Sequence, residues 1–392
     1  MLADTSKPQI RSYVRILFFI VLLLLIVGSI FIYSSSSVYA LSHCGNASYF
    51  LKKQLAGIAL GFIAMLVVLF IPLHYIKKSA PYFFLFTLLI TSLSFVSYFS
   101  LRIHGSSRWI RYMGFSFQPS ELLKIGLLLY SAYFLDKKIN QQEDKNTLVT
   151  LKHIFIPFSI LLIVPAIILL KQPDFGFTVT LVATILCTCL LINFQTRRIL
   201  FSFLALIPLA GLLIFLQPYR LKRITIFLNP WQDPQGSGFQ IIQSLIAIGS
   251  GGFWGIGIGQ SRQKFFYLPM QHTDFIFSII AEEVGFIGIS FLILLYILFL
   301  YYGLRIAYLL HDHFSRVFVL NVTVFISLQA LMNMMVATGM VPTKGVGLPF
   351  VSYGNTGLVT NFIMLGIIFN MVYSQAKSMQ SLSYNKKLFI DN

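Results

Sequence analysis

The chain has 392 residues, of which 57% are hydrophobic and only 10% are charged, and its formal net charge at pH 7 is +17. Soluble domains carry about 25% charged residues, so this composition excludes a water-soluble globular protein. The three cysteines lack metal-ligand or disulfide-framework spacing, and the basic excess indicates anionic lipid headgroups or an anionic substrate rather than nucleic acid.

Apolar stretches of roughly 20 residues can cross the hydrocarbon core of a bilayer as helices. The sequence therefore predicts an all-α polytopic membrane protein with about ten transmembrane helices, at residues 13–34, 53–72, 81–100, 119–135, 153–170, 176–194, 199–217, 274–302, 316–340 and 350–373. Ten crossings place both termini on one side of the membrane. The first stretch has no cleavage site followed by a soluble domain, so we expect it to remain as a helix.

Basic residues set the expected orientation, because cytoplasmic loops are enriched in Lys and Arg. Outside one long loop, most Lys and Arg residues fall on the inner side if the N-terminus is cytoplasmic. We therefore expect one membrane domain over residues 1–392, with cytoplasmic tails at 1–12 and 374–392. The long loop, residues 218–273, would be extracytoplasmic and join the seventh and eighth helices.

The long loop carries many aromatic residues among its glycines, which is typical of chain that lies in the headgroup layer. We expect short interfacial or re-entrant helices there. The glycines between 249 and 259 lack the strand-then-helix context of a nucleotide-binding loop, so we interpret them as close-packing and bending positions.

Acidic residues are rare, and four of them lie at the start of, or within, the sixth and eighth predicted helices. Asp274 directly precedes the eighth stretch; it is either a functional carboxylate at an apolar boundary or the N-cap of that helix. Asp174 precedes the sixth stretch and is expected to cap it or form a turn. Glu282 and Glu283, further along the eighth helix, are expected to make buried polar contacts rather than to act in catalysis.

Lys124 lies within the fourth stretch, three residues after Glu121. An ammonium group in an apolar span must be hydrated or paired. Two alternatives follow: Lys124 faces a water-filled outer cavity, or Glu121 is its (i, i+3) partner in a structural ion pair.

Several long motifs resemble the SEDS family of bacterial envelope proteins, which contains FtsW, RodA and SpoVE. They are GSSRWIRYMGFSFQPSELLK, KQPDFG, the long loop from RITIFLNPWQDP to HTDFIFSIIAEEVG, and TGMVPTKGVGLPFVSYGNTG. The wording of the long loop is more similar to FtsW, the septal member, than to RodA.

The resemblance implies a peptidoglycan glycosyltransferase that polymerises lipid II on the outer face of the cytoplasmic (inner) membrane during cell division and releases undecaprenyl diphosphate. It implies that Asp274 is the catalytic base. The implied partners are membrane lipids, a class B penicillin-binding transpeptidase and other division proteins. No cofactor is firmly implied, and a requirement for a divalent cation stays open. The residues expected to hold the lipid II diphosphate or sugars are Arg108, Lys124, Arg223, Lys264, Lys344 and Ser352.

The sequence departs from the family wording beside the expected site. Met270 stands where an acidic residue is usual before HTDF, and Arg111 stands where an acidic residue is common after RWI.

Two other functions stay open. One is a lipid II flippase, although the polar motifs gather on the outer side and mid-span charge is sparse. The other is a structural scaffold, which would leave Asp274 without a role. If the protein is a polymerase, an elongation-type, RodA-like role also stays open.

Overall fold

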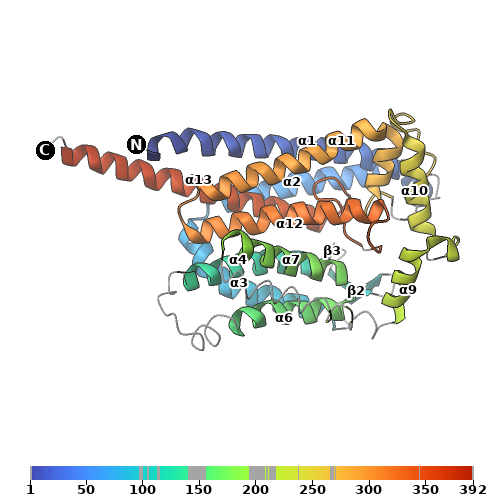
Figure 1. Cartoon of the computed structure of the whole chain (residues 1–392), viewed down its shortest axis with the longest axis horizontal. Coiled ribbons are helices and arrows are strands. Elements are labelled where there is room, and N and C mark those ends of the chain that lie inside the picture. The colour runs from blue at the N-terminus through green and yellow to red at the C-terminus, as the bar shows by residue number, and fades with distance from the viewer. Residues whose placement is uncertain are drawn as a thin grey trace.

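The computed structural model describes residues 2–96, 100–103, 106–112, 115–139, 156–193, 208, 211, 218–236, 238–264, 269, 271–343 and 345–390. Its long helices lie side by side in one bundle (Figure 1). These helices are α1 (Leu2–Cys44), α2 (Tyr49–Phe70), α3 (Leu73–Leu93), α4 (Pro119–Ile139), α6 (Ile156–Lys171), α7 (Phe175–Leu191), α11 (Ile276–Leu309), α12 (His313–Ala337) and α13 (Asn355–Ile390).

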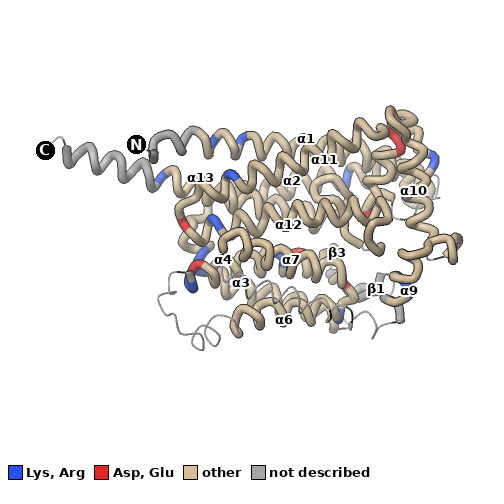
Figure 2. The backbone as a smooth tube through the Cα atoms, viewed as in Figure 1, with Lys and Arg blue, Asp and Glu red and all other residues tan. Residues whose placement is uncertain are grey.

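The helical, polytopic membrane fold predicted from the apolar stretches is confirmed. Among the described helices, five are long and apolar enough to cross a membrane: Gln9–Cys44 in α1, α2, α11, α12 and Asn355–Lys377 in α13. Lys, Arg, Asp and Glu residues lie mainly toward the two ends of the bundle, and few of the described residues in its middle are charged (Figure 2). This distribution fits a bundle whose central layer faces hydrocarbon.

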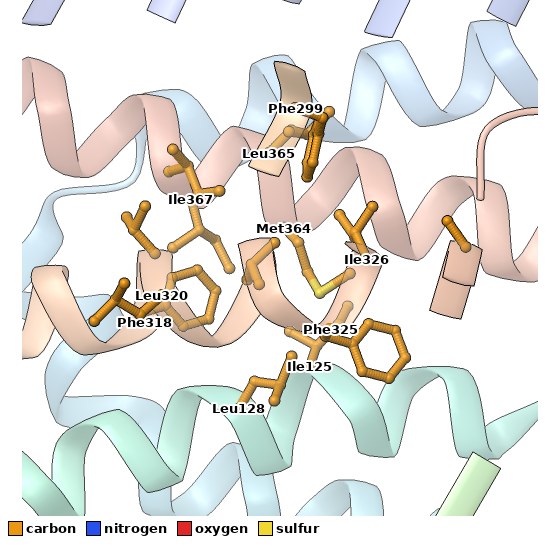
Figure 3. Close-up of a cluster of buried hydrophobic side chains, with 14 of the residues drawn as sticks. Ile125, Leu128, Phe299, Phe318, Leu320, Phe325, Ile326, Met364, Leu365 and Ile367 are labelled. Atoms are coloured by element: carbon orange, nitrogen blue, oxygen red, sulfur yellow. The ribbon is translucent and has the colours of Figure 1, made fainter. Parts of the chain in front are cut away.

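Helix α12 lies at the centre of the bundle, where it packs against α4, α7, α10, α11 and α13. Its apolar side chains interdigitate with those of α4, α11 and α13 in a buried cluster (Figure 3). Membrane helices associate through such close packing and through interhelical hydrogen bonds. One bond of this kind runs from Asn321 of α12 to the hydroxyl of Ser131 in α4, at 2.9 Å.

The two ends of the bundle differ. The start of α1 and the end of α13 lie at one end (Figure 1), as an even number of crossings requires. The opposite end, here called the loop end, carries α9 (Pro218–Leu228), the short helix η2 (Pro230–Gln232) and α10 (Phe239–Gly251). The expectation of short helices in the long loop is therefore confirmed.

Several helix boundaries differ from the sequence prediction. Helix α1 covers the described part of the predicted N-terminal tail and extends past the predicted end at residue 34. Helix α3 begins eight residues earlier and ends seven residues earlier than the predicted stretch 81–100, and it contains Pro81 inside it. Its polar first turns are tolerated because Lys77 pairs with Asp136 of α4, at 2.8 Å. Helix α13 continues to Ile390, so the described part of the predicted C-terminal tail is helical. The predicted seventh helix, 199–217, falls outside the described residues apart from 208 and 211.

A small antiparallel sheet at the loop end was not predicted. Its strands are β1 (Ser100–Ile103), β2 (Ser106–Tyr112) and β3 (Phe115–Phe117), in the order β1-β2-β3. Leu101 pairs with Trp109, and Ile110 pairs with Phe117. The sheet lies between the third and fourth predicted spans, overlapping the third only at Ser100, and it places Arg108 at the loop end.

Candidate functional site

The first turns of α11 form a separate segment because the helix breaks at Gly285, whose φ is +63°. Backbone hydrogen bonds of 2.9 to 3.3 Å join residues 282–287, on both sides of the break, to residues 252–257 after α10. These bonds satisfy amides and carbonyls that the break would otherwise leave unpaired. A Cβ on Gly251 or Gly255 would collide with the backbone of α11. Gly251 and Gly255 are thus close-packing positions, and Gly252, Gly257 and Gly259, which have positive φ, are bending positions, as the sequence predicted. Gly249 has open space around its Cβ.

Glu282 and Glu283 form hydrogen bonds to the chain that follows this loop and to α1. Glu282 accepts hydrogen bonds from the Ser261 hydroxyl at 2.5 Å and from the Arg262 amide at 3.1 Å. Glu283 accepts from the Ser34 hydroxyl of α1 at 2.5 Å. Both carboxylates are buried. The structure therefore places them in polar contacts between segments, which is the role expected from the sequence.

The segment just before α11 is held by its backbone. The carbonyls of three consecutive residues, 272–274, each accept one hydrogen bond. The donors are the Tyr353 amide at 3.0 Å, the Ser352 hydroxyl at 2.6 Å and the Asn333 carboxamide at 2.8 Å. Two of these donors belong to the loop between α12 and α13, and the third belongs to α12. Both segments are thereby fixed to each other at the loop end.

Within this fixed backbone, the carboxylate of Asp274 makes no hydrogen bond or ion pair with another described residue. Helix α11 begins at Ile276 with Phe275 at the cap position, and no side chain caps it, so Asp274 does not serve as the N-cap. Burial raises the pKa of Asp274 to about 7; the nearby Arg108 lowers this pKa, Asp174 raises it and Arg223 lowers it. A carboxylate with such a pKa can accept a proton near neutral pH.

Arg108 approaches the same place from strand β2. Its guanidinium donates to the carbonyls of Gln172 at 3.1 Å and Pro173 at 2.5 Å. A Cβ added to Gly345 would lie 3.5 Å from Asp274 Oδ2 and 3.6 Å from Arg108 Nη1. The carboxylate and the guanidinium thus flank one glycine, whose missing side chain leaves both groups accessible.

Arg223 and Asp174, also singled out in the sequence, lie near Asp274 and Arg108. Arg223 of α9 donates to the carbonyl of Thr343 at 2.7 Å, beside the same loop. Asp174 caps α7 by accepting from the Phe177 amide at 3.4 Å, and it lies 3.8 Å from Arg108 Nη1. Burial raises the pKa of Asp174, while Arg108 lowers it. Its capping role matches the interpretation made from the sequence.

The structure places Lys124 differently from the expectation of a water-filled cavity, and that expectation is wrong. The residue is 1% exposed. Its ammonium lies 2.5 Å from Glu121 Oε2 and donates to Asn361 at 2.9 Å. The second sequence alternative, a structural pair with Glu121, describes what is observed. The physical reason is that a buried carboxylate and a carboxamide replace the hydration that an ammonium needs in an apolar span.

Two other residues expected to hold substrate, Ser352 and Lys264, make contacts within the protein. The Ser352 hydroxyl donates to Thr273 and accepts from the Leu348 amide at 2.7 Å, so it joins two loops rather than facing an open surface. Lys264 is buried, donates to the carbonyl of Gly259 and lines a cavity of about 620 Å³ between α1, α2 and the segment after α10. Lys344 lies outside the described residues.

Sequence reasoning missed two carboxamides of α12. Gln329 donates to the Gly347 carbonyl at 3.0 Å, and Asn333 donates to Asp274 and Val346. The available signal was a polar residue repeated one turn apart in an otherwise apolar stretch. Within the described residues, no three His, Cys, Asp or Glu side chains are grouped closely enough to hold a metal ion, so we derive no step through one.

Comparisons with known proteins agree on one family. The family model for FtsW, RodA and SpoVE, described as a cell cycle protein, matches residues 14–377. A probable peptidoglycan glycosyltransferase FtsW of Geobacter sp. (strain M18) is 39% identical over 363 residues, which are 93% of this chain and 97% of that protein. Stage V sporulation protein E of Bacillus subtilis (strain 168) is 38% identical over 358 residues, covering 91% of this chain and 96% of that protein.

Solved structures show the same fold. A chain of a peptidoglycan synthase complex, solved to show how polymerization and crosslinking are coordinated, has a TM-score of 0.74 at 28% identity and covers 91% of this chain and 96% of its own length. The rod shape determining protein RodA of Thermus thermophilus has a TM-score of 0.67 at 24% identity, covering 91% of this chain and 95% of its own.

Proposed function

This chain belongs to the FtsW, RodA and SpoVE family of cell cycle proteins, and from that membership we propose that it is a division-type peptidoglycan glycosyltransferase. It polymerises lipid II into glycan strands on the outer face of the cytoplasmic membrane. The names of the relatives and the likeness to the peptidoglycan synthase complex support this activity. The observation that carries the proposal for the site is the free, partly buried carboxylate of Asp274, with a pKa of about 7 and arginines beside it.

In this proposal Asp274 accepts the proton of the attacking sugar hydroxyl. The hydroxyl oxygen forms the new glycosidic bond to the anomeric carbon, while the bond from that carbon to the diphosphate breaks. The lipid diphosphate leaves with the electron pair. Arg108 and Arg223 supply positive charge where negative charge develops on the leaving group, and such stabilisation is often a large part of catalysis.

The same geometry supports the proposed partners. Exposed aromatic side chains at the loop end, among them Trp231 and Trp254, suit contact with lipid headgroups. The solved neighbour couples polymerization to crosslinking. We therefore assign to this chain a class B penicillin-binding transpeptidase and other division proteins as partners, in a bacterial cytoplasmic membrane.

The proposal is tested with purified protein, its class B partner and labelled lipid II. We expect glycan strands that form in the presence of moenomycin. Asp274→Asn keeps the side-chain size but removes the base, so polymerisation should fall by about 10²- to 10⁴-fold. The matched control is Asp312→Asn, the same substitution at the opposite end of the bundle, where Asp312 caps α12.

Two results would contradict the proposal. Substantial turnover by Asp274→Asn would show that this carboxylate is not the base. Movement of lipid II between leaflets of a liposome, without polymer, would favour the flippase instead.

A further inference from the structure

Asn333 links the two segments that flank the candidate site. Its Nδ2 lies 2.8 Å from the carbonyl of Asp274 and 2.7 Å from the carbonyl of Val346. Both hydrogens of the carboxamide are thus used on two chain segments distant in sequence. Asn333 is 1% exposed, and Gln329, one turn earlier on the same face of α12, donates to the neighbouring carbonyl of Gly347.

The orientation of the Asn333 carboxamide is set by these contacts. Two carbonyls require the NH₂ group, so the oxygen points the other way, where it is buried and has no hydrogen-bond partner in the described part of the chain. An unpaired buried acceptor costs about 1–3 kcal/mol. An apolar side chain of similar shape would avoid that cost but would take the Asn333 donor away from the carbonyls of Asp274 and Val346, so the two donated bonds outweigh the one unpaired oxygen.

We infer that Asn333 is a positioning residue for glycosyl transfer: it fixes the backbone of Asp274 to the Gly345–Val346 segment and so holds the free carboxylate beside Arg108. The inference rests on the proposed role of Asp274 as the base. The hydrogen bond from Asn333 to the main-chain carbonyl of Asp274, here called the tether, restricts the position of the carboxylate without using any of its acceptor capacity. The carboxylate stays available for the substrate hydroxyl.

Loss of the tether has a predictable electrostatic result. Among the described residues, the charged groups that face Asp274 are Arg108 from β2, Arg223 from α9 and Asp174 from the turn before α7. His272, in the same segment as Asp274, has a pKa lowered to about 4 by burial and is neutral at working pH. Burial is the main cause of the raised pKa of Asp274. A segment released from α12 admits water, so this pKa falls and the acidic limb of the rate profile moves to lower pH.

The test replaces Asn333 by Leu, which has the same branching at Cγ but no donor. Misplacing a reacting group by about 1 Å can lower the rate by roughly 10²-fold, so we expect kcat to fall at least about tenfold. KM for lipid II should change little, and the acidic limb should move to lower pH. Asn333→Gln, which keeps the donor group, should recover part of kcat.

Two matched controls separate positioning from general stability. Asn370 is a buried carboxamide at the other end of the bundle that donates to the carbonyls of Val68, Leu69 and Ile71. Asn370→Leu should lower thermal stability but leave kcat and the pH profile unchanged. Gln329→Leu releases the loop between α12 and α13 but not Asp274, so the acidic limb should stay in place.

The outcomes distinguish this inference from the proposed function. If Asp274→Asn is inactive but Asn333→Leu has the wild-type kcat and pH profile, the positioning role is wrong and the base assignment stands. If Asp274→Asn is active, the base assignment fails, and the inference fails with it. Should Asn333→Leu not yield monodisperse protein, Asn333→Ser, whose hydroxyl is too short to reach both carbonyls, carries the same expectation.

Discussion

Replacing Lys124 by Met decides whether this buried ammonium stabilises the fold or binds the substrate. The structure places its Nζ 2.5 Å from Glu121 Oε2, with the lysine 1% exposed. Lys124→Met therefore leaves a buried carboxylate whose remaining contact is the Thr360 hydroxyl, at 3.2 Å. Breaking a buried pair in this way costs about 3–5 kcal/mol, whereas replacing both partners by neutral residues is often neutral or stabilising.

The assay compares three proteins in the same detergent: Lys124→Met, Glu121→Gln and the double variant. Unfolding temperature is followed by intrinsic fluorescence, and polymerisation by the glycan strands formed from lipid II. We expect Lys124→Met to unfold at clearly lower temperature and the double variant to recover both stability and activity. Lys137→Met is the matched control, because Lys137 lies on the same helix α4 but its side chain is exposed. A charge that solvent reaches contributes only about 0–1 kcal/mol.

The reasoning is refuted by a double variant that is stable but inactive. That result would mean that the ammonium itself is needed by the reaction, as in the alternative where it holds the lipid diphosphate. A Lys124→Met protein with unchanged unfolding temperature would equally contradict the structural role of the pair.

Further predictions concern the pH dependence and the glycine contacts. Because Arg108 lowers the pKa of Asp274, Arg108→Gln should move the acidic limb of the polymerisation profile to higher pH. Because Asp174 raises the same pKa, Asp174→Asn should move the limb to lower pH. Shifts of both variants in the same direction would contradict the electrostatic account. Gly255→Ala should destabilise the protein by a few kcal/mol, since its Cβ would meet the backbone of Glu283, whereas Gly249→Ala, with open space around its Cβ, should unfold at the wild-type temperature.

The membrane class and most helix positions followed from the sequence, because the apolarity of a segment is a local property. Helix α12 was predicted at 316–340 and is observed at His313–Ala337, and the short helices of the long loop were expected from its aromatic and glycine content. Asp274 was also identifiable, since a carboxylate at the edge of an apolar stretch is unusual. The shift of α3 and the small sheet were not foreseen, because hydropathy alone does not show that Lys77 finds a partner on α4.

The pairing of polar groups was decided only by the tertiary structure. The sequence left Lys124 with two alternatives, and the contacts with Glu121 and Asn361 choose between them. Ser352 was expected to meet substrate, but its hydroxyl is used between two loops, and Asn333 was not noticed at all. The physical reason is that a polar atom in an apolar bundle must find a partner, and the partner's identity depends on which distant segments the fold brings within hydrogen-bond distance.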